Sequence, residues 1–175
     1  MKWPRFLCLL LLAASLTAMG KKQPPFSIRF YAEGNPQDTG TFATQIQLLS
    51  PPKMVYIQKI PALSERDIIA AYPFDAADGS KGCGFKLDDH GTMMLDSISV
   101  EKRGTMLVAV VNGRQVVDLQ IDKRISDGIV VIPNGLQPLE IEMIKKRFHM
   151  MGPAATKGTA KPTPTPNPQN PKLEY

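Results

Sequence analysis

The chain has 175 residues with 21 Lys and Arg against 16 Asp and Glu, which gives a formal net charge of +5. Most of this excess lies towards the two ends, because residues 26–150 carry 14 basic and 15 acidic side chains. A nearly neutral body with mixed signs excludes the basic face that is typical of nucleic-acid-binding domains. Residues 26–150 are enough for one domain with its own core.

Residues 1–20 have the layout of a secretory signal peptide. A short basic start is followed by an apolar stretch at residues 6–14 and then by small, mildly polar residues. The apolar stretch is shorter than the roughly 20 residues that span a bilayer, and no later segment is long and apolar enough. We therefore predict cleavage after Gly20, or alternatively after Ala18, and export to the periplasm or the medium.

The opposite end, residues 151–175, is rich in Pro and Thr, and its repeated prolines favour extended backbone. It has too few apolar residues to offset the entropy of ordering, so we predict a disordered tail. Two roles stay open for it: a solvated tail, or a spacer or ligand for a partner in the cell envelope.

The domain begins with three predicted strands, at residues 26–32, 42–49 and 53–60, because apolar and polar residues alternate there. The following motif Ser64-Glu65-Arg66-Asp67 is similar to a capping box, and it predicts a helix over residues 65–72.

A strand is predicted next at residues 84–88, then a turn at residues 89–91 and a helix at residues 93–102. The dipeptide Asn112-Gly113 lies between two β-rich runs, at residues 105–111 and 114–121. It predicts a tight hairpin, because a type I′ turn needs positive φ at both central residues.

Three elements are predicted at the end of the domain: a strand at residues 128–132, a turn at Asn134-Gly135 and a helix over residues 138–148 that begins with Pro138. The complete order is βββ-α-β-α-β-β-β-α. It predicts an α+β domain in which a mostly antiparallel sheet carries two or three helices on one face.

The stretch at residues 63–148 resembles the head subdomain of the first periplasmic domain of SecD and SecF, with residues 26–60 as a strand-rich lead-in. The resemblance is carried by ordered landmarks: Leu63 to Ile68, Phe74 to Gly79, Phe85 to Leu87, Gly91, Leu95, Gly104, Leu107 to Gly113, Ile125, Gly128, Ile132 and Glu140. Asp118, Leu119 and Ser99 depart from the family pattern. The resemblance implies this fold and an extracytoplasmic setting. It does not imply proton-driven export, because the membrane helices of SecD and SecF are missing.

Few residues suggest chemistry. His90 with Asp88, Asp89 and Cys83 lacks the converging set that a metal needs, since Cys83 and His90 are expected at opposite ends of one strand. Cys83, the single cysteine of the predicted mature chain, is expected in the core.

Other candidates have simpler explanations. Ser64 is explained as a cap rather than a nucleophile, and Gly82-Cys83-Gly84 lacks the pattern of a phosphate loop. Asp75 and Asp78 lack the full calcium-loop pattern. The methionines are expected mostly as core filler: Met93, Met94, Met143, Met150 and Met151. No catalytic, cofactor-binding or metal-binding residue, and no cofactor, is predicted.

Two main function classes follow. The first is a non-enzymatic binding or accessory module that engages an envelope protein, an export component or an unfolded polypeptide, by adding a partner strand to an exposed sheet edge. The second is an envelope enzyme, such as a hydrolase, built from loop acids at Asp75, Asp78, Asp88, Asp89 and His90. A purely structural role also stays open, and the sequence does not predict an oligomeric state.

Overall fold

The computed structural model describes residues 26–38 and 40–152, so the predicted signal peptide and nearly all of the predicted tail lie outside the described residues. Within the described part, no helix is long and apolar enough to cross a membrane. The strands are β1 (Ile28–Ala32), β2 (Ala43–Gln47), β3 (Met54–Gln58), β4 (Leu63–Ser64), β5 (Ile68–Asp75), β6 (Lys81–Leu87), β7 (Met106–Val111), β8 (Arg114–Gln120), β9 (Ile129–Leu136) and β10 (His149–Met150). The helices are α2 (Asp89–Glu101) and α3 (Pro138–Arg147).

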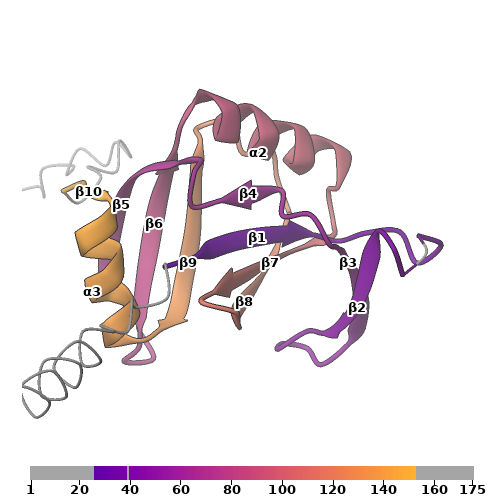
Figure 1. Ribbon diagram of the computed structural model, residues 1–175, viewed down its shortest axis with the longest axis horizontal. Coiled ribbons are helices and arrows are strands. Elements are labelled where there is room, and N and C mark those ends of the chain that lie inside the picture. The colour runs from indigo at the N-terminus through magenta and orange to yellow at the C-terminus, as the bar shows by residue number, and fades with distance from the viewer. Residues whose placement is uncertain (1–25, 39, 153–175) are drawn as a thin grey trace, which may run out of the picture.

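The strands form two four-stranded sheets and a separate hairpin (Figure 1). The first sheet has the order β4-β1-β7-β8, the second has the order β10-β5-β6-β9, and the hairpin is β2-β3. All pairings are antiparallel except that of β10 with β5. Helix α2 lies along the top of Figure 1 and α3 stands at its left side. The predicted α+β class with largely antiparallel pairing is confirmed.

One apolar core joins the two sheets. At its centre Phe30 of β1 packs edge to face against Phe85 of β6, and Phe85 packs in the same way against Phe148, which follows α3. Both pairs have ring centroids 6.4 Å apart, within the range that aromatic pairs favour. All three side chains are buried, so this column of rings ties both sheets to the end of the domain.

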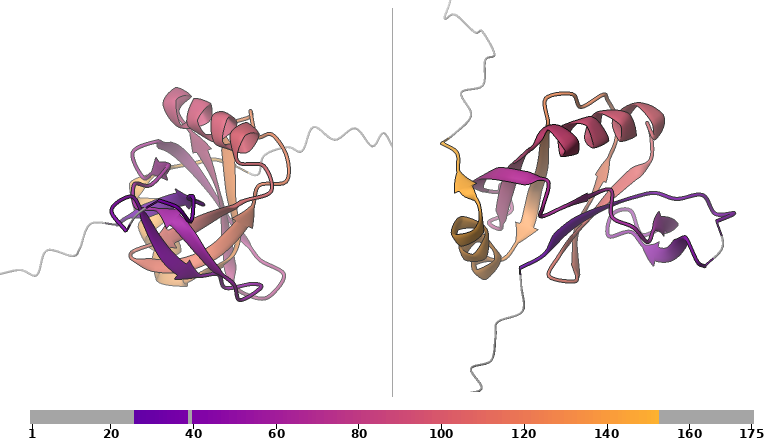
Figure 2. Two further views of the ribbon diagram at one scale, coloured as in Figure 1. Left: turned by 90° about the vertical axis from the view of Figure 1, so that its right-hand side faces the viewer. Right: turned by 45° about the horizontal axis from the view of Figure 1, so that its top comes forward.

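The β2-β3 hairpin has a smaller core of its own. Leu48, Val55 and Ile57 pack with Val108 on the outer face of the first sheet. The Gly34 N–H donates to the Tyr56 carbonyl at 2.8 Å, which fixes β3 to the end of β1. In the right-hand view of Figure 2 this part of the chain projects beyond the rest of the domain. The hairpin therefore projects from the domain, and β3 is the strand that is bonded to the body.

Several local predictions are confirmed. Asn112 and Gly113 have φ of 50° and 80°, as a type I′ turn requires, and they join β7 to β8. Pro138 is the first residue of α3, and the three strands of the lead-in form as β1, β2 and β3.

The predicted helix over residues 65–72 is wrong, because these residues form a turn and the first part of β5. One expected hydrogen bond exists, because the Ser64 N–H donates to Asp67 Oδ2 at 2.8 Å. The Asp67 N–H, however, donates to the Ser64 carbonyl instead of its hydroxyl and so closes a turn. The same residues can cap a helix or close a turn. Two β-branched residues and Pro73 follow, and these favour a strand.

Two predicted turns are also wrong. Residues 89–91 form the first turn of α2, with Asp88 as its N-cap. Asn134 and Gly135 belong to β9, where the register shifts against β6 and Gly135 has a φ of 84°. Glycine supplies the positive φ there within an irregular strand instead of a chain reversal.

Gly82 offers a test of the packing between β5 and β9. A Cβ at this position would lie 2.5 Å from the Pro133 carbonyl oxygen and would overlap the ring of Phe74, whereas a Cβ at Gly84 would meet only the Tyr72 carbonyl at 4.0 Å. We expect Gly82→Ala to lower the free energy of unfolding by about 1–3 kcal/mol through overpacking. Urea unfolding measures the loss, and Gly84→Ala on the same strand is the matched control. Equal stability of the two variants would contradict this packing.

Candidate functional site

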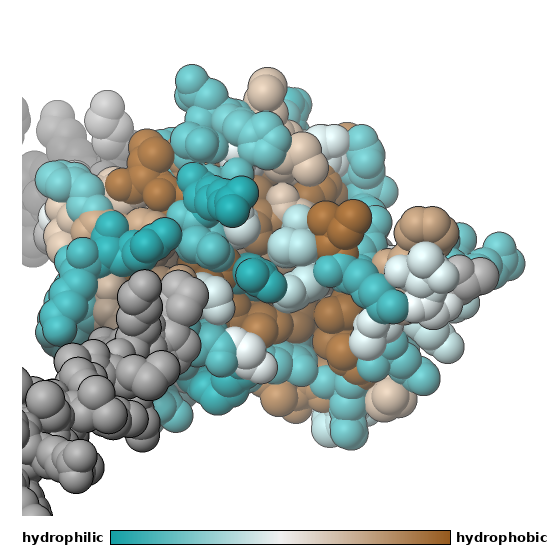
Figure 3. All heavy atoms as spheres, viewed as in Figure 1, coloured by the Kyte–Doolittle hydropathy of each residue, from teal (hydrophilic) through white to brown (hydrophobic). Residues whose placement is uncertain are grey.

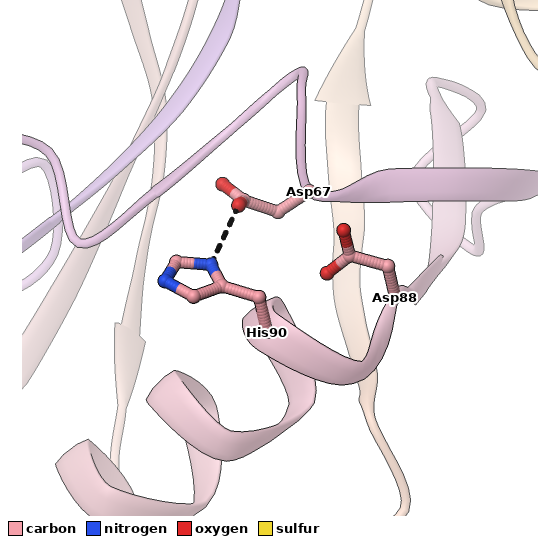
Figure 4. Close-up of side chains that lie close together, drawn as sticks. All are labelled: Asp67, Asp88 and His90. Atoms are coloured by element: carbon pink, nitrogen blue, oxygen red, sulfur yellow. Dashed lines mark hydrogen bonds and ion pairs between the residues drawn. The ribbon is translucent and has the colours of Figure 1, made fainter.

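The only group of metal-ligating side chains among the described residues is Asp67, Asp88 and His90 (Figure 4). One candidate ligand atom from each residue lies within 4.8 Å of the others. The β4–β5 turn supplies Asp67, and the start of α2 supplies the other two. His90 Nδ1 lies 3.1 Å from Asp67 Oδ1, so this ring nitrogen donates to the carboxylate. Of the residues considered near His90 in the sequence, Asp88 belongs to this group, whereas Cys83 and Asp89 do not.

Asp67 is held by its local hydrogen bonds. Burial acts to raise the pKa of its carboxyl, but donation by the Ser64 N–H, by His90 and by the Ser64 hydroxyl outweighs burial and lowers this pKa below its ordinary value. The Asp67 carbonyl also accepts from the Asp88 N–H at 2.8 Å. Asp67 therefore links the β4–β5 turn to the start of α2.

The group serves local structure more directly than chemistry. Asp88 Oδ1 accepts from the Gly91 N–H at 2.7 Å and so caps α2. A hydrolytic triad needs the histidine beside the serine hydroxyl, but Asp67 lies between Ser64 and His90 and accepts from both. His90 is therefore not placed to remove the hydroxyl proton. Only three ligands converge, and both carboxylates are already engaged, which is a poor match for a structural zinc site.

The other predicted acids lie elsewhere. Asp75 forms an ion pair with Lys81, and Asp78 accepts from the Ser80 hydroxyl at 2.6 Å, both at the turn between β5 and β6. Asp67 lies at the opposite end of β5, roughly 26 Å from Asp75 at about 3.3 Å per strand residue. The structure thus does not assemble the loop acids into one site.

Cys83 is buried in β6, as predicted. Burial raises the pKa of its thiol to about 12. A thiol that stays protonated is a poor nucleophile and a poor metal ligand.

A different feature emerges at β2, whose outer edge is free. The Lys59 N–H donates to the Phe42 carbonyl and the Leu48 N–H donates to the Lys53 carbonyl, so the backbone groups of residues 42, 44, 46 and 48 point towards β3. Backbone groups alternate along a strand. Those of Ala43, Gln45 and Gln47 therefore point away from β3, and within the described residues β2 pairs only with β3. Ala43 is only 3% exposed, so the open part of this edge lies at Gln45 and Gln47.

The other sheet edges are blunted in ways that discourage further pairing. β4 and β10 have only two residues each, β8 carries Arg114 and Asp118, and β9 contains Pro133. β2 reads Ala-Thr-Gln-Ile-Gln, with neither a charge nor a proline. It is the longest unprotected edge in the described part of the chain.

A groove lies at the Phe42 end of this edge, between the hairpin and α2, and we call it the hairpin–helix groove. It has a volume of about 400 Å³ and is lined by Asp38, Phe42, Gln58, Ile60, Pro61, Ala62, Met94, Ser97, Ile98, Glu101 and Lys102. Phe42 is 67% exposed and Ile60 is 78% exposed. Figure 3 shows hydrophobic residues reaching the surface below α2 and beside the hairpin.

The methionine prediction needs a correction here. Met93 is 67% exposed and Met94 is 37% exposed, so neither is core filler. Leu95 and Ile98 supply the buried face of α2, which leaves both methionines on its outer side. The sequence did contain a signal for exposed apolar residues, because this helix has more apolar residues than one buried face can hold. Which of them face solvent depends on contacts with distant strands.

The fold and these surfaces define an α+β domain with an open strand edge beside an apolar groove. No family model matches the chain, and no curated protein matches it. Two solved structures of SecDF match. One is described as a membrane component that enhances protein export, with a TM-score of 0.48 and 16% identity over 70% of this chain and 63% of that chain. The other is SecDF in a super-membrane-facing form, with a TM-score of 0.43 and 12% identity over 83% of this chain and 33% of that chain. Both are too distant to transfer an activity.

The link through Asp67 predicts a specific pH dependence. A lowered pKa in the folded state adds stability above the unfolded value of about 3.9, and that stability is lost as pH falls through the folded value. We expect Asp67→Asn to cost about 1–2 kcal/mol at neutral pH and progressively less in acid below about pH 4. Urea unfolding of both proteins across this range measures the difference. Exposed Asp122→Asn is the control, and a cost independent of pH would contradict the role of the Asp67 charge.

Proposed function

We propose that this protein is a non-enzymatic binding module that holds an extended polypeptide as an added strand on β2. The observation that carries the proposal is the free edge at Gln45 and Gln47. Their two outward N–H groups and two outward carbonyls form a template for strand addition. Because main-chain groups are common to all polypeptides, such a site recognises extended conformation more than sequence.

Two further features support this function. The edge is preorganised, since the small core of Leu48, Val55 and Ile57 holds the hairpin on the body, and a preorganised site loses less entropy on binding. A two-stranded sheet is also marginal alone, so a third strand on β2 would stabilise it. The candidate acids, in contrast, are spread over both ends of β5 or engaged in turns and caps.

The setting of this function is proposed from residues 1–20. Their signal-peptide pattern favours export, which would bring the domain to unfolded exported polypeptides and to envelope proteins. The partner class that fits both the edge and this setting is therefore an exported chain before it folds.

Gln45→Pro tests strand addition directly. Proline removes one of the two outward N–H groups, while the hydrogen bonds of residues 44 and 46 to β3 stay intact. We expect the variant to fold and to lose most of its affinity for a fluorescently labelled peptide of alternating valine and threonine. Fluorescence anisotropy measures binding, and circular dichroism checks the fold.

The matched control is Gln45→Ala, which keeps the backbone N–H and should bind as the unmodified protein does. A peptide with N-methyl groups on alternate amides should bind poorly to either protein. If Gln45→Pro binds the peptide as tightly as the unmodified protein does, the peptide does not bind as a strand on β2 and the proposal is contradicted. If sedimentation instead shows a dimer that Gln45→Pro dissociates, the edge pairs with a second copy and the polypeptide proposal fails.

The proposed export of the protein is tested by a separate measurement. When the full chain is produced in a bacterial host, N-terminal sequencing of the protein from the envelope or medium should begin at Lys21, or at Met19 for cleavage after Ala18. Full-length protein confined to the cytoplasm would contradict the proposed setting. A variant with Leu10→Arg in the apolar stretch is the control, because a charge there should block export.

A further inference from the structure

The hairpin–helix groove lies beyond the Phe42 end of β2. Phe42 directly precedes β2 and Ile60 follows β3, so both lie at the same end of the hairpin. Met94 and Glu101 of α2 line the opposite side of the groove. Ala43 is buried between this groove and the open edge at Gln45, so a chain that pairs with Gln45 and Gln47 reaches the groove with the residues beyond its paired segment.

The groove is suited to a large apolar side chain. Phe42, Ile60 and Met94 line the groove and are exposed although they are large and apolar. Ile98, on the buried face of α2, also lines the groove. Its volume of about 400 Å³ falls in the lower part of the range of ligand pockets. Methionine has a flexible, polarisable side chain that adapts to differently shaped partners. An apolar group that enters would shield these three exposed apolar side chains from water together.

The residues that line the groove carry a net negative charge. Its ionisable lining is Asp38, Glu101 and Lys102, an excess of negative charge. The Lys102 ammonium donates to the Glu33 carbonyl at 2.6 Å, which holds it at the edge of the groove. Helix α2 itself contains Asp89, Asp96 and Glu101 but neither lysine nor arginine. A cation beside the entering apolar group is therefore favoured over an anion.

We infer that the hairpin–helix groove binds an anchor of the added strand: a large apolar side chain with a lysine or arginine next to it. This inference rests on the proposed function. It specifies which side chains the bound polypeptide carries, which strand addition alone does not. The edge supplies pairing that tolerates any sequence, and the groove selects extended segments that are apolar and basic.

Three labelled peptides test the anchor. All have alternating valine and threonine, and at the centre they carry Phe-Lys, Phe-Glu or Ser-Lys. We expect the full-length protein to bind Phe-Lys about tenfold or more tighter than Ser-Lys, because a phenyl ring is buried. Phe-Lys should bind about two- to fivefold tighter than Phe-Glu, with a difference that shrinks in high salt.

Variants then locate the anchor. Phe42→Ser with Met94→Ser should remove the preference for Phe over Ser, and Glu101→Lys should reverse the preference for Lys over Glu. Phe42 and Glu101 are exposed and Met94 is 37% exposed, so these variants should fold. Leu139→Ser, at a side chain 68% exposed on α3, is the matched control and should change neither preference.

The outcomes separate the anchor from the proposed function. If the three peptides bind equally and Gln45→Pro abolishes binding, strand addition stands and the anchor is overturned. If the Phe preference survives in the Phe42→Ser and Met94→Ser variant, the apolar group binds elsewhere and the anchor is also overturned. If no peptide binds at any salt concentration, both proposals fail.

Discussion

The contact between Phe30, Phe85 and Phe148 is the interaction on which the rest of the structure depends. It joins β1 of one sheet to β6 of the other and to the segment after α3, all within one buried core. The position of β1 then determines where the chain leaves the core. At that exit Gly34 pairs with Tyr56 and fixes the hairpin. The open edge is thus placed by packing that lies far from it.

The same arrangement separates stability from recognition. The buried face of β1 serves the main core, and the outer face of its sheet carries the small core of the hairpin. Gln45 and Gln47 of β2 are exposed, so these two residues can vary without loosening the body. A protein that binds through backbone groups needs such an edge, although open edges also invite aggregation. The short, charged or proline-bearing edges elsewhere confine that risk to one strand.

The sequence predicts those features whose cause is local. Asn112-Gly113 needs positive φ within the dipeptide itself, and Pro138 fits a first helical turn in any context. The failure at residues 65–72 has a physical reason: the Ser64 N–H donates to the Asp67 carboxylate in this turn as it would in a capping box. The choice between the two is made by pairing with β6, which local spacing does not encode. His90 likewise contacts Asp67 across 23 positions of sequence, which no motif indicates.

The open edge illustrates a further limit of sequence reasoning. Alternation in residues 42–49 predicts a strand, but not that β2 would have a neighbour on only one side. The sequence pattern also does not predict that Phe42 and Ile60 are exposed, because exposure depends on which distant residues pack against a side chain. Once known, however, these features combine in a definite way. An uncharged edge alone would accept many chains weakly, whereas an apolar, acidic groove at its end adds selection without demanding an exact sequence. Under the proposed function, such a domain would hold diverse extended polypeptides while still preferring those that expose apolar and basic side chains together.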